Sequence, residues 1–485
     1  MCHSVRIEYS GTMFQRSGAA HHIKLISSRR CRFKSSFAVA LNAASKLVTP
    51  KILWNNPISL VSKEMNTLAK NIVALIGSGH PVLNKVTSYY FETEGKKVRP
   101  LLVLLLSRAL SEIPMTERNH LKIDKSDVPE DPIYSKPSQN QLFQRPASSI
   151  SPLHILHGIK PLNPLTKGPE PLPEETFDKQ RGILPKQRRL AEIVEMIHTA
   201  SLLHDDVIDH SDTRRGRPSG NTAFTNKMAV LAGDFLLGRA TVSISRLHNP
   251  EVVELMSNSI ANLVEGEFMQ LKNTSIDADI DTIENGHKLL PVPSKKLEVK
   301  EHDFRVPSRQ QGLQLSHDQI IETAFEYYIH KTYLKTAALI SKSCRCAAIL
   351  SGASPAVIDE CYDFGRNLGI CFQLVDDMLD FTVSGKDLGK PSGADLKLGI
   401  ATAPVLFAWK EDPSLGPLIS RNFSERGDVE KTIDSVRLHN GIAKTKILAE
   451  EYRDKALQNL RDSLPESDAR SALEFLTNSI LTRRK

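Results

Sequence analysis

The sequence predicts an all-α fold, in which helices pack around one core. Apolar residues recur at intervals of three and four over residues 72–76, 101–110, 193–203 and 230–240. Alternating Val and Ile residues bounded by Asn-Gly or Asp-Gly turns are nearly absent, which argues against a sheet. The 485 residues are 40% hydrophobic and 25% charged, so the chain is globular and has enough apolar material for a large core.

The first 50 residues have the composition of a mitochondrial transit peptide. Between Met1 and Ser62 the only acidic residue is Glu8, whereas arginine and lysine are spread among serine, alanine and isolated apolar residues. Residues 13–36 are rich in arginine and serine and lack the continuous apolar centre of a secretory signal. We therefore expect a leader at 1–50, with a disordered basic tail as the alternative, and a mature protein on the matrix side of the mitochondrion.

Two polar stretches interrupt the helical pattern. Twelve prolines fall within residues 111–186, a density that no helix tolerates. Residues 273–317 are again polar and of mixed charge, with three further prolines. Because motifs lie on both sides of each stretch, we interpret both as insertions within a single domain that spans residues 66–485.

Cysteine usage and hydropathy exclude two other classes of protein. The six cysteines include no Cys-x-x-Cys pair and therefore fit neither a disulfide framework nor a zinc site, so we expect reduced, packed thiols. No run of eighteen apolar residues occurs. We expect any contact with a membrane to be peripheral.

A first cluster of carboxylates follows the third helical stretch. Asp205 and Asp209, with Asp206 between them, lie in LLHDDVIDHSDTRRGRPS. Residues four apart project from one face of a helix about one turn apart. Such a pair repels itself unless a cation lies between the two carboxylates, and carboxylate oxygens suit magnesium. A solvated acidic face is the alternative for this cluster taken alone.

A second cluster repeats the pattern within apolar surroundings. Asp376, Asp377 and Asp380 lie in FQLVDDMLDF, where most of the neighbours are apolar. Burial of three carboxylates among such residues is costly unless metal or basic partners neutralise them. Two such clusters in one helical chain therefore predict a magnesium site with six candidate ligands: Asp205, Asp206, Asp209, Asp376, Asp377 and Asp380.

Basic residues follow both clusters and predict that the metal is shared with a diphosphate. Magnesium in proteins commonly divides its shell between carboxylates and substrate phosphates. Candidate phosphate ligands lie in GKKVRP, in the double arginine after the first cluster, in YYIHKTYLKT and after the second cluster. The positive charge lies beside carboxylates and in the leader rather than among stacking aromatics, which argues against nucleic-acid binding.

These motifs, in this order, resemble those of the trans-isoprenyl diphosphate synthases. That family carries GK-x-x-RP, Asp-Asp-x-x-Asp followed by two arginines, a Lys-Thr pair, and Phe-Gln-x-x-Asp-Asp-x-x-Asp, and all four are present. The resemblance implies an isoprenoid-synthase-type helical bundle around a central apolar cavity, a homodimer, Mg²⁺ as cofactor, and condensation of isopentenyl diphosphate with an allylic diphosphate. The two insertions depart from the compact members of the family.

The resemblance also implies roles for individual residues. Isopentenyl diphosphate would be bound by Lys96, Arg99, His198 and Arg215, and the allylic diphosphate by Arg214, Lys331, Thr332, Gln373 and Lys390. Asp205, Asp209, Lys331 and Asp376 would be the catalytic residues. His198 lies seven residues before Asp205, two helical turns along the same face. Gln270 and Lys397 are further candidates.

Product length should depend on the helix before Asp205. One turn back lie Ala200 and Ser201, both small, and Ile197 lies one turn deeper. A bulky aromatic at the first two positions would close the predicted cavity near the metal. Because a helical turn rises about 5.4 Å, comparable to one isoprene unit, the open face predicts a long product.

Two other functions use part of this pattern. A terpene cyclase also ionises allylic diphosphates with aspartate-bound magnesium, but it does not need the isopentenyl diphosphate site that GKKVRP and His198 would supply. A non-catalytic subunit of a heteromeric synthase would be expected to have lost metal or phosphate ligands, and none is missing here.

Overall fold

The computed structural model describes residues 57–78, 80–91, 97–118, 182–214, 217–271, 316–382 and 393–483. The predicted leader at 1–50 and most of the predicted insertions at 111–186 and 273–317 lie outside the described residues.

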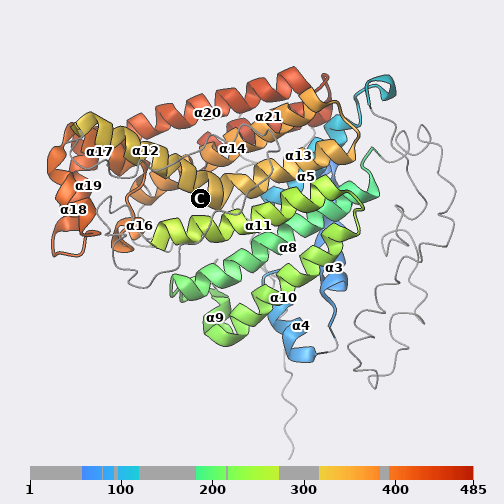
Figure 1. Cartoon of the computed structure of the whole chain (residues 1–485), viewed down its shortest axis with the longest axis horizontal. Coiled ribbons are helices and arrows are strands. Elements are labelled where there is room, and N and C mark those ends of the chain that lie inside the picture. The colour runs from blue at the N-terminus through green and yellow to red at the C-terminus, as the bar shows by residue number, and fades with distance from the viewer. Residues whose placement is uncertain are drawn as a thin grey trace, which may run out of the picture.

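Helices make up nearly all of the described secondary structure (Figure 1), which confirms the all-α prediction. Two-residue strands β1 (Thr213–Arg214) and β2 (Arg217–Pro218) pair antiparallel in a small hairpin that the sequence did not predict. The helices are α2 (Pro57–Leu60), α3 (Ser62–Ile76), α4 (Pro81–Ser88), α5 (Val98–Leu110), η1 (Met115–Glu117), α8 (Pro185–Ile208), α9 (Gly220–Ala223), α10 (Asn226–Ser245), α11 (Pro250–Leu271), α12 (His317–Thr332), η4 (Tyr333–Ala337), α13 (Ala338–Leu350), α14 (Pro355–Thr382), α16 (Ala394–Lys397), α17 (Ala403–Glu411), η5 (Pro413–Leu415), α18 (Gly416–Ser420), α19 (Asp428–Leu438), α20 (Gly441–Ser463) and α21 (Asp468–Leu481).

Local sequence sets where several long helices begin. Proline is the first residue of α4, α8, α11 and α14, a position where its missing N–H is not needed and its fixed φ suits the helix. Helix α12 begins with a capping box, in which the Ser316 hydroxyl accepts from the Gln319 N–H and the Gln319 side chain accepts from the Ser316 N–H.

The core forms around α5 and α8. All six residues from Leu101 to Leu106 of α5 are buried, and α8 buries Ile193, Val194 and Ile197 completely. Helix α10 packs along α8, and α14 packs along α13 and α20 (Figure 1). The two aspartate clusters therefore lie on helices that the core holds rigidly.

Two glycines let α14 approach the preceding helical segment closely. A Cβ added to Gly365 would stand 2.6 Å from the Cα of Ser341, and one added to Gly369 would stand 2.6 Å from the Cα of Ala337. Side chains larger than hydrogen do not fit at such distances. This contact fixes the segment that contains Thr336 against the helix that contains Gln373.

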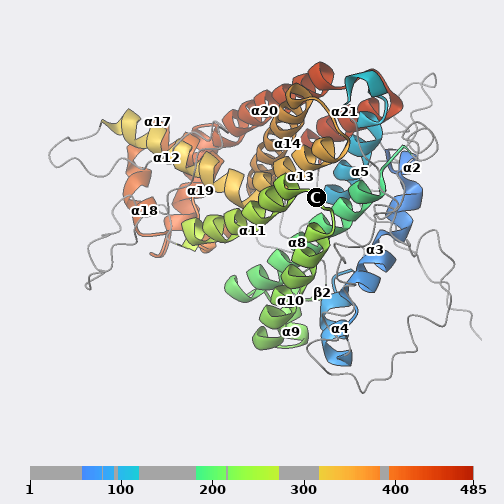
Figure 2. The same ribbon diagram turned by 45° about the vertical axis from the view of Figure 1, so that its right-hand side comes forward.

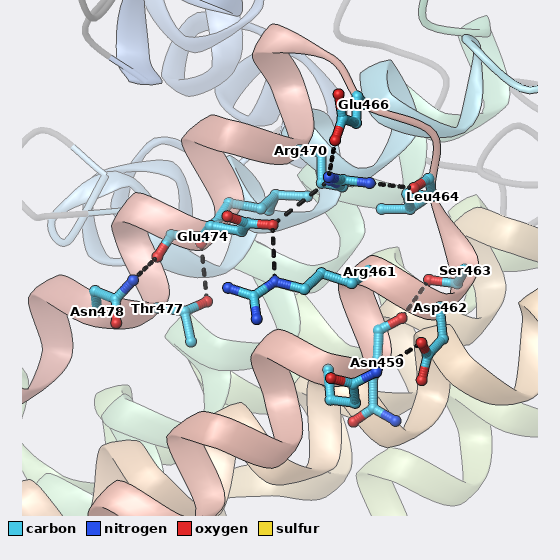
Figure 3. Close-up of polar contacts among 12 residues, drawn as sticks. Asn459, Arg461, Asp462, Ser463, Leu464, Glu466, Arg470, Glu474, Thr477 and Asn478 are labelled. Atoms are coloured by element: carbon cyan, nitrogen blue, oxygen red, sulfur yellow. Dashed lines mark hydrogen bonds and ion pairs between the residues drawn. The ribbon is translucent and has the colours of Figure 1, made fainter.

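The turn between α20 and α21 is tied by the side chains of Arg470 and Glu474 (Figure 3). Arg470 Nη1 donates to the Leu464 carbonyl at 2.8 Å, and its Nε lies 3.5 Å from Glu474 Oε1. Glu474 also lies 3.6 Å from Arg461 Nε on α20. Helix α21 is thereby directed so that Arg483, just beyond its end, reaches α14.

The described cysteines are packed thiols, as the sequence predicts. Cys344, Cys346, Cys361 and Cys371 are buried free thiols, and burial raises the pKa of Cys344 to about 12. Among the described residues one helix, α10, is long and apolar enough to cross a membrane, by length and composition only. Its buried face packs against α8, as the face of a core helix does.

Ile197 and Ala200, predicted to line a central cavity, are completely buried in the main core cluster. A hollow of about 340 Å³ lies elsewhere, between α3 and α4, where Val73, Ile76 and Asn84 line it.

Candidate active site between two aspartate clusters

The first aspartate cluster occupies the last turn of α8. Asp205 and Asp206 lie within the helix, and Asp209 is its C-cap residue. The side chains differ in exposure, because Asp205 and Asp209 are half-buried whereas Asp206 is completely buried. Only the outer two carboxylates of this cluster are therefore partly open to solvent.

Asp206 is held by groups of the protein. Its Oδ1 accepts from Arg214 Nε at 2.7 Å and lies 2.6 Å from Arg214 Nη2, while its Oδ2 accepts from the Tyr90 hydroxyl. The pair raises the pKa of Arg214, because the carboxylate stabilises the charged guanidinium despite its burial. Asp206 thus fixes the arginine that follows the cluster.

The surroundings of Asp205 disfavour ionisation of its carboxyl group. Burial raises the pKa of Asp205 to about 7, and the Lys335 ammonium opposes that rise while Glu267 and Asp209 add to it. Lys335 is therefore close enough to the first cluster for its charge to act there. A carboxyl in this setting gains strongly from a nearby cation.

The lysine belongs to a π-helical turn, η4, between α12 and α13. Lys335 Nζ lies 2.5 Å from Glu267 Oε2 and donates to Gln270 Oε1 at 2.8 Å, both on α11. The next residue, Thr336, donates its hydroxyl to Gln373 Oε1 on α14 at 2.8 Å. Turns of this kind occur often at functional sites. Here the charge of Lys335 acts on Asp205 in the first cluster, and Thr336 contacts Gln373, which bonds Asp377 in the second.

The second cluster is also anchored through its middle residue. Asp377 Oδ1 accepts from Gln373 Nε2 at 2.8 Å, and Oδ2 accepts from the Tyr328 hydroxyl at 2.6 Å. Asp377 is 2% exposed. Burial raises its pKa, whereas the bonds from Tyr328 and Gln373 lower it. Gln373 therefore links Asp377 to Thr336.

Asp376 and Asp380 have different surroundings. Asp376, with a side chain 35% exposed, forms an ion pair with Arg483, whose guanidinium lies 4.4 Å from the centre of the Phe372 ring. Burial lowers the pKa of Arg483 to about 10. The oxygens of Asp380 accept from the N–H groups of Ala394 and Asp395 at 3.1 and 3.3 Å and so hold the start of α16.

The predicted Lys-Thr pair, Lys331 and Thr332, has different surroundings from a second such pair, Lys335 and Thr336, four residues later. Lys331 and Thr332 are buried beside Tyr328, with Lys331 Nζ 5.8 Å from that ring. Burial lowers the pKa of Lys331, whereas Asp377 raises it. Lys335 and Thr336, which the sequence analysis did not select, contact α11 and α14. The Lys-Thr pair occurs twice within HKTYLKT, so the sequence already offers Lys335 and Thr336 as candidates beside Lys331 and Thr332.

The structure brings together some of the other predicted residues. Arg99 Nη1 and His198 Nε2 lie 3.0 Å apart, which joins two predicted ligands of isopentenyl diphosphate. Ile197 and Ala200 are completely buried, and Ser201 is half-buried with its hydroxyl donating to the His198 carbonyl. Lys96, Arg215 and Lys390 lie outside the described residues.

The carboxylates of the two clusters fit a metal ion that takes most of its ligands from water and substrate phosphates. In the described part of the chain, no three histidine, cysteine, aspartate or glutamate side chains gather closely enough to hold an ion by themselves. Asp206 and Asp377 are buried and bonded to protein donors, whereas Asp205, Asp209, Asp376 and Asp380 are half-buried. Of these four, Asp380 accepts from two backbone N–H groups and Asp376 is paired with Arg483. Magnesium commonly binds through one or two carboxylates and completes its shell with water and phosphate oxygens.

Comparison with known proteins places these observations in one family. The polyprenyl synthetase family model matches residues 171–290 and 297–436. The chain is 54% identical to the "probable hexaprenyl pyrophosphate synthase, mitochondrial" of Yarrowia lipolytica, over 92% of this chain and 89% of that protein. It is 45% identical to the Neurospora crassa protein of the same name, over 93% and 88%.

A solved structure shares the fold. The decaprenyl diphosphate synthase of Rhodobacter capsulatus matches 88% of this chain and 98% of its own, with a TM-score of 0.59 and 24% identity. The sequence match to the family model and the two relatives together cover the helices that carry both aspartate clusters. The chain belongs to the polyprenyl synthetase family.

Proposed function

We propose that the protein is a trans-polyprenyl diphosphate synthase that adds isopentenyl diphosphate units head to tail onto an allylic diphosphate such as farnesyl diphosphate. The observation that carries the proposal is the π-helical turn, where Lys335 acts on Asp205 and Thr336 bonds Gln373 beside Asp377. The names of the relatives support a long product, hexaprenyl diphosphate, for the ubiquinone side chain.

Magnesium is the cofactor that this donor set favours. We assign Asp205 and Asp209 to the metal at the first cluster and Asp376 to the metal at the second. Asp206, Asp377 and Asp380 then support the site through their protein hydrogen bonds. The metal supplies charge that stabilises the departing diphosphate.

The chemistry requires charge stabilisation and exclusion of water rather than a nucleophilic side chain. The bond between the allylic carbon and its diphosphate oxygen breaks, the double bond of isopentenyl diphosphate forms the new carbon–carbon bond, and a proton then leaves to the released diphosphate. Arg214 and Lys335 balance the charge that develops on that diphosphate. Arg99 and His198 hold the diphosphate of the second substrate, and the apolar core shields the cation from water.

A homodimer is the assembly that the surface favours. Large apolar side chains are exposed at the start of α10, where Leu231 is 53% exposed, and at the end of α11, where Val264 and Phe268 are 53% and 61% exposed. Both helices therefore carry large apolar side chains that the described part of a single chain leaves exposed. A second copy would cover this face. Light scattering of the full chain should give twice the chain mass, and the monomer mass would contradict the assignment.

The location that we propose is the mitochondrial matrix, with peripheral contact to the inner membrane. The mitochondrial names of the relatives support the compartment, and the basic leader supports import. The apolar product would not diffuse freely in water, so release at a membrane surface is expected. Fractionation of mitochondria, with carbonate extraction of the membranes, should release the protein.

The test of the activity is an incubation of the full chain with labelled isopentenyl diphosphate, farnesyl diphosphate and magnesium, followed by sizing of the extracted products. We expect a magnesium-dependent long polyprenyl diphosphate that disappears in Asp205→Ala. A folded protein that elongates nothing would instead favour the non-catalytic subunit of a heteromeric synthase. A cyclic hydrocarbon made from farnesyl diphosphate alone would favour the terpene cyclase.

A further inference from the structure

The Tyr90 side chain reaches the first aspartate cluster from a different part of the chain. It lies just after α4 and is 7% exposed. Its hydroxyl donates to Asp206 Oδ2 and accepts from the Gly220 N–H at 2.7 Å. Burial and the Asp206 carboxylate both raise the pKa of Tyr90, so the hydroxyl keeps its proton and remains the donor.

The same hydroxyl ties together the two ends of the loop that carries Arg214. Asp206 lies before the β1–β2 hairpin and Gly220 lies directly after it. A Cβ at Gly220 would stand 2.8 Å from Leu203 Cδ2 and 3.3 Å from the Tyr90 oxygen, so a larger residue there would have to displace the end of the Leu203 side chain. Tyr89 adds a bond from its hydroxyl to the Pro218 carbonyl at 2.9 Å. Figure 2 shows α4 beside β2 at this point.

Asp206 transmits this arrangement to the arginine. Tyr90 takes one carboxylate oxygen, and Arg214 Nε and Nη2 both approach the other at 2.7 and 2.6 Å. Because both carboxylate oxygens are engaged, rotation of the carboxylate or of the guanidinium plane would break at least one of these bonds. Arg214 has five N–H donors, and its side chain is 26% exposed, which leaves an edge available to a substrate diphosphate.

The second cluster uses the same device. Tyr328 donates to Asp377 Oδ2, and the other oxygen accepts from Gln373. In both clusters the middle aspartate therefore joins a buried tyrosine from another segment to a side chain predicted to contact the allylic diphosphate. Two independent occurrences argue that the tyrosine serves the site rather than local packing alone.

We propose that Tyr90 is a positioning residue for the allylic diphosphate, which acts through Asp206 to hold Arg214 in its binding orientation. The inference rests on the proposed function, because it assumes that Arg214 binds this substrate. Tyr90 does not contact the reacting atoms. Its removal should therefore weaken binding of one substrate without removing any group from the metal or from the second substrate.

The test is Tyr90→Phe in the full chain, which keeps the ring and removes only the hydroxyl. We expect the KM for the allylic diphosphate to rise about tenfold, the effect of losing one hydrogen bond to a charged group, while the KM for isopentenyl diphosphate changes less than about twofold. In an Arg214→Gln background the same change should alter the KM for the allylic diphosphate by less than about twofold, because the residue that Tyr90 positions is already lost.

The control is Tyr452→Phe on α20, a half-buried tyrosine whose ring centre lies 5.1 Å from Lys455 Nζ, outside the contacts described for both clusters. It should leave both KM values unchanged. An equal rise in both KM values for Tyr90→Phe, a tenfold rise in both backgrounds, or unfolding of Tyr90→Phe alone would overturn the inference, because each would assign the hydroxyl to general stability. An inactive wild-type protein in the same assay would instead overturn the proposed function.

Discussion

Gly369 of α14 lies so close to Ala337 at the end of the π-helical turn that an added Cβ would stand 2.6 Å from the Ala337 Cα and 2.7 Å from its Cβ. Backbone atoms cannot give way as a flexible side chain does. We therefore expect Gly369→Ala to destabilise the protein by about 1–3 kcal/mol, the usual cost of an overpacked core. It should also displace Lys335 and Thr336, so that activity falls by at least about tenfold in protein that remains folded.

Gly238→Ala is the matched control for that change. Gly238 also lies within a helix, but a Cβ there would meet nothing within 4 Å. Alanine favours helix over glycine by about 1 kcal/mol, so this variant should be at least as stable as the wild type and fully active. Thermal unfolding and product formation measured on both variants check the pair. Equal behaviour of the two would show that the close contact does not position the turn.

The two Lys-Thr pairs make different predictions. Lys335 has a side chain 23% exposed and acts on Asp205, whereas Lys331 is 7% exposed beside Asp377. We expect Lys335→Met to lower kcat/KM for the allylic diphosphate by about a hundredfold or more, as loss of a charged contact to a phosphate does. Lys331→Met should cost at most about tenfold, because an apolar chain of similar length fills the buried position. Steady-state kinetics with varied allylic substrate measures both effects. A larger loss of kcat/KM in Lys331→Met than in Lys335→Met would favour Lys331 as the ligand of the allylic diphosphate.

Asp205 should give the metal-free protein a distinctive dependence on pH. Its ordinary pKa of 3.8 rises to about 7 in the folded protein, so between about pH 4 and 7 the folded state holds a proton that the unfolded state has lost. The free energy of unfolding therefore falls as the pH rises through this window and levels above it. Asp205→Asn lacks this titration. The melting temperature of the variant minus that of the wild type should therefore increase as the pH rises from 4.5 to 7.

Magnesium provides the complementary measurement. At pH 8, where Asp205 is ionised, the ion should raise the melting temperature of the wild type, and at pH 5 it should raise it much less, because a protonated carboxyl binds metal poorly. Asp205→Asn should respond weakly at both values. Parallel melting curves for the two proteins across the whole range would contradict the raised pKa.

The sequence was sufficient for the helices and for the residue types of the site, but not for the direction of each side chain. Helical periodicity located α3, α5, α8 and α10 because each buries a continuous apolar face. The Asp-Asp-x-x-Asp spacing could not distinguish Asp205 from Asp206, because that difference depends on Tyr90 and Arg214, which approach from elsewhere in the chain. Lys335 was missed for a similar reason, since a π-helical turn rotates residues away from the face that a regular helix would give.

The length of the product offers a test of the face of α8 below Asp205. Ala200 is completely buried in the main core cluster, one turn before Asp205. On the proposed function the growing chain passes along this face of α8, and a larger side chain at position 200 would block it. We expect Ala200→Leu to shorten the product and Ala200→Phe to shorten it further, as reversed-phase analysis of the dephosphorylated alcohols would measure. Overpacking will cost about 1–3 kcal/mol of stability, so each variant is compared at a temperature at which it is fully folded. Because a general loss of stability lowers the amount of product but not its length, a folded and active Ala200→Phe that makes the wild-type chain length would place the elongation path along another helix.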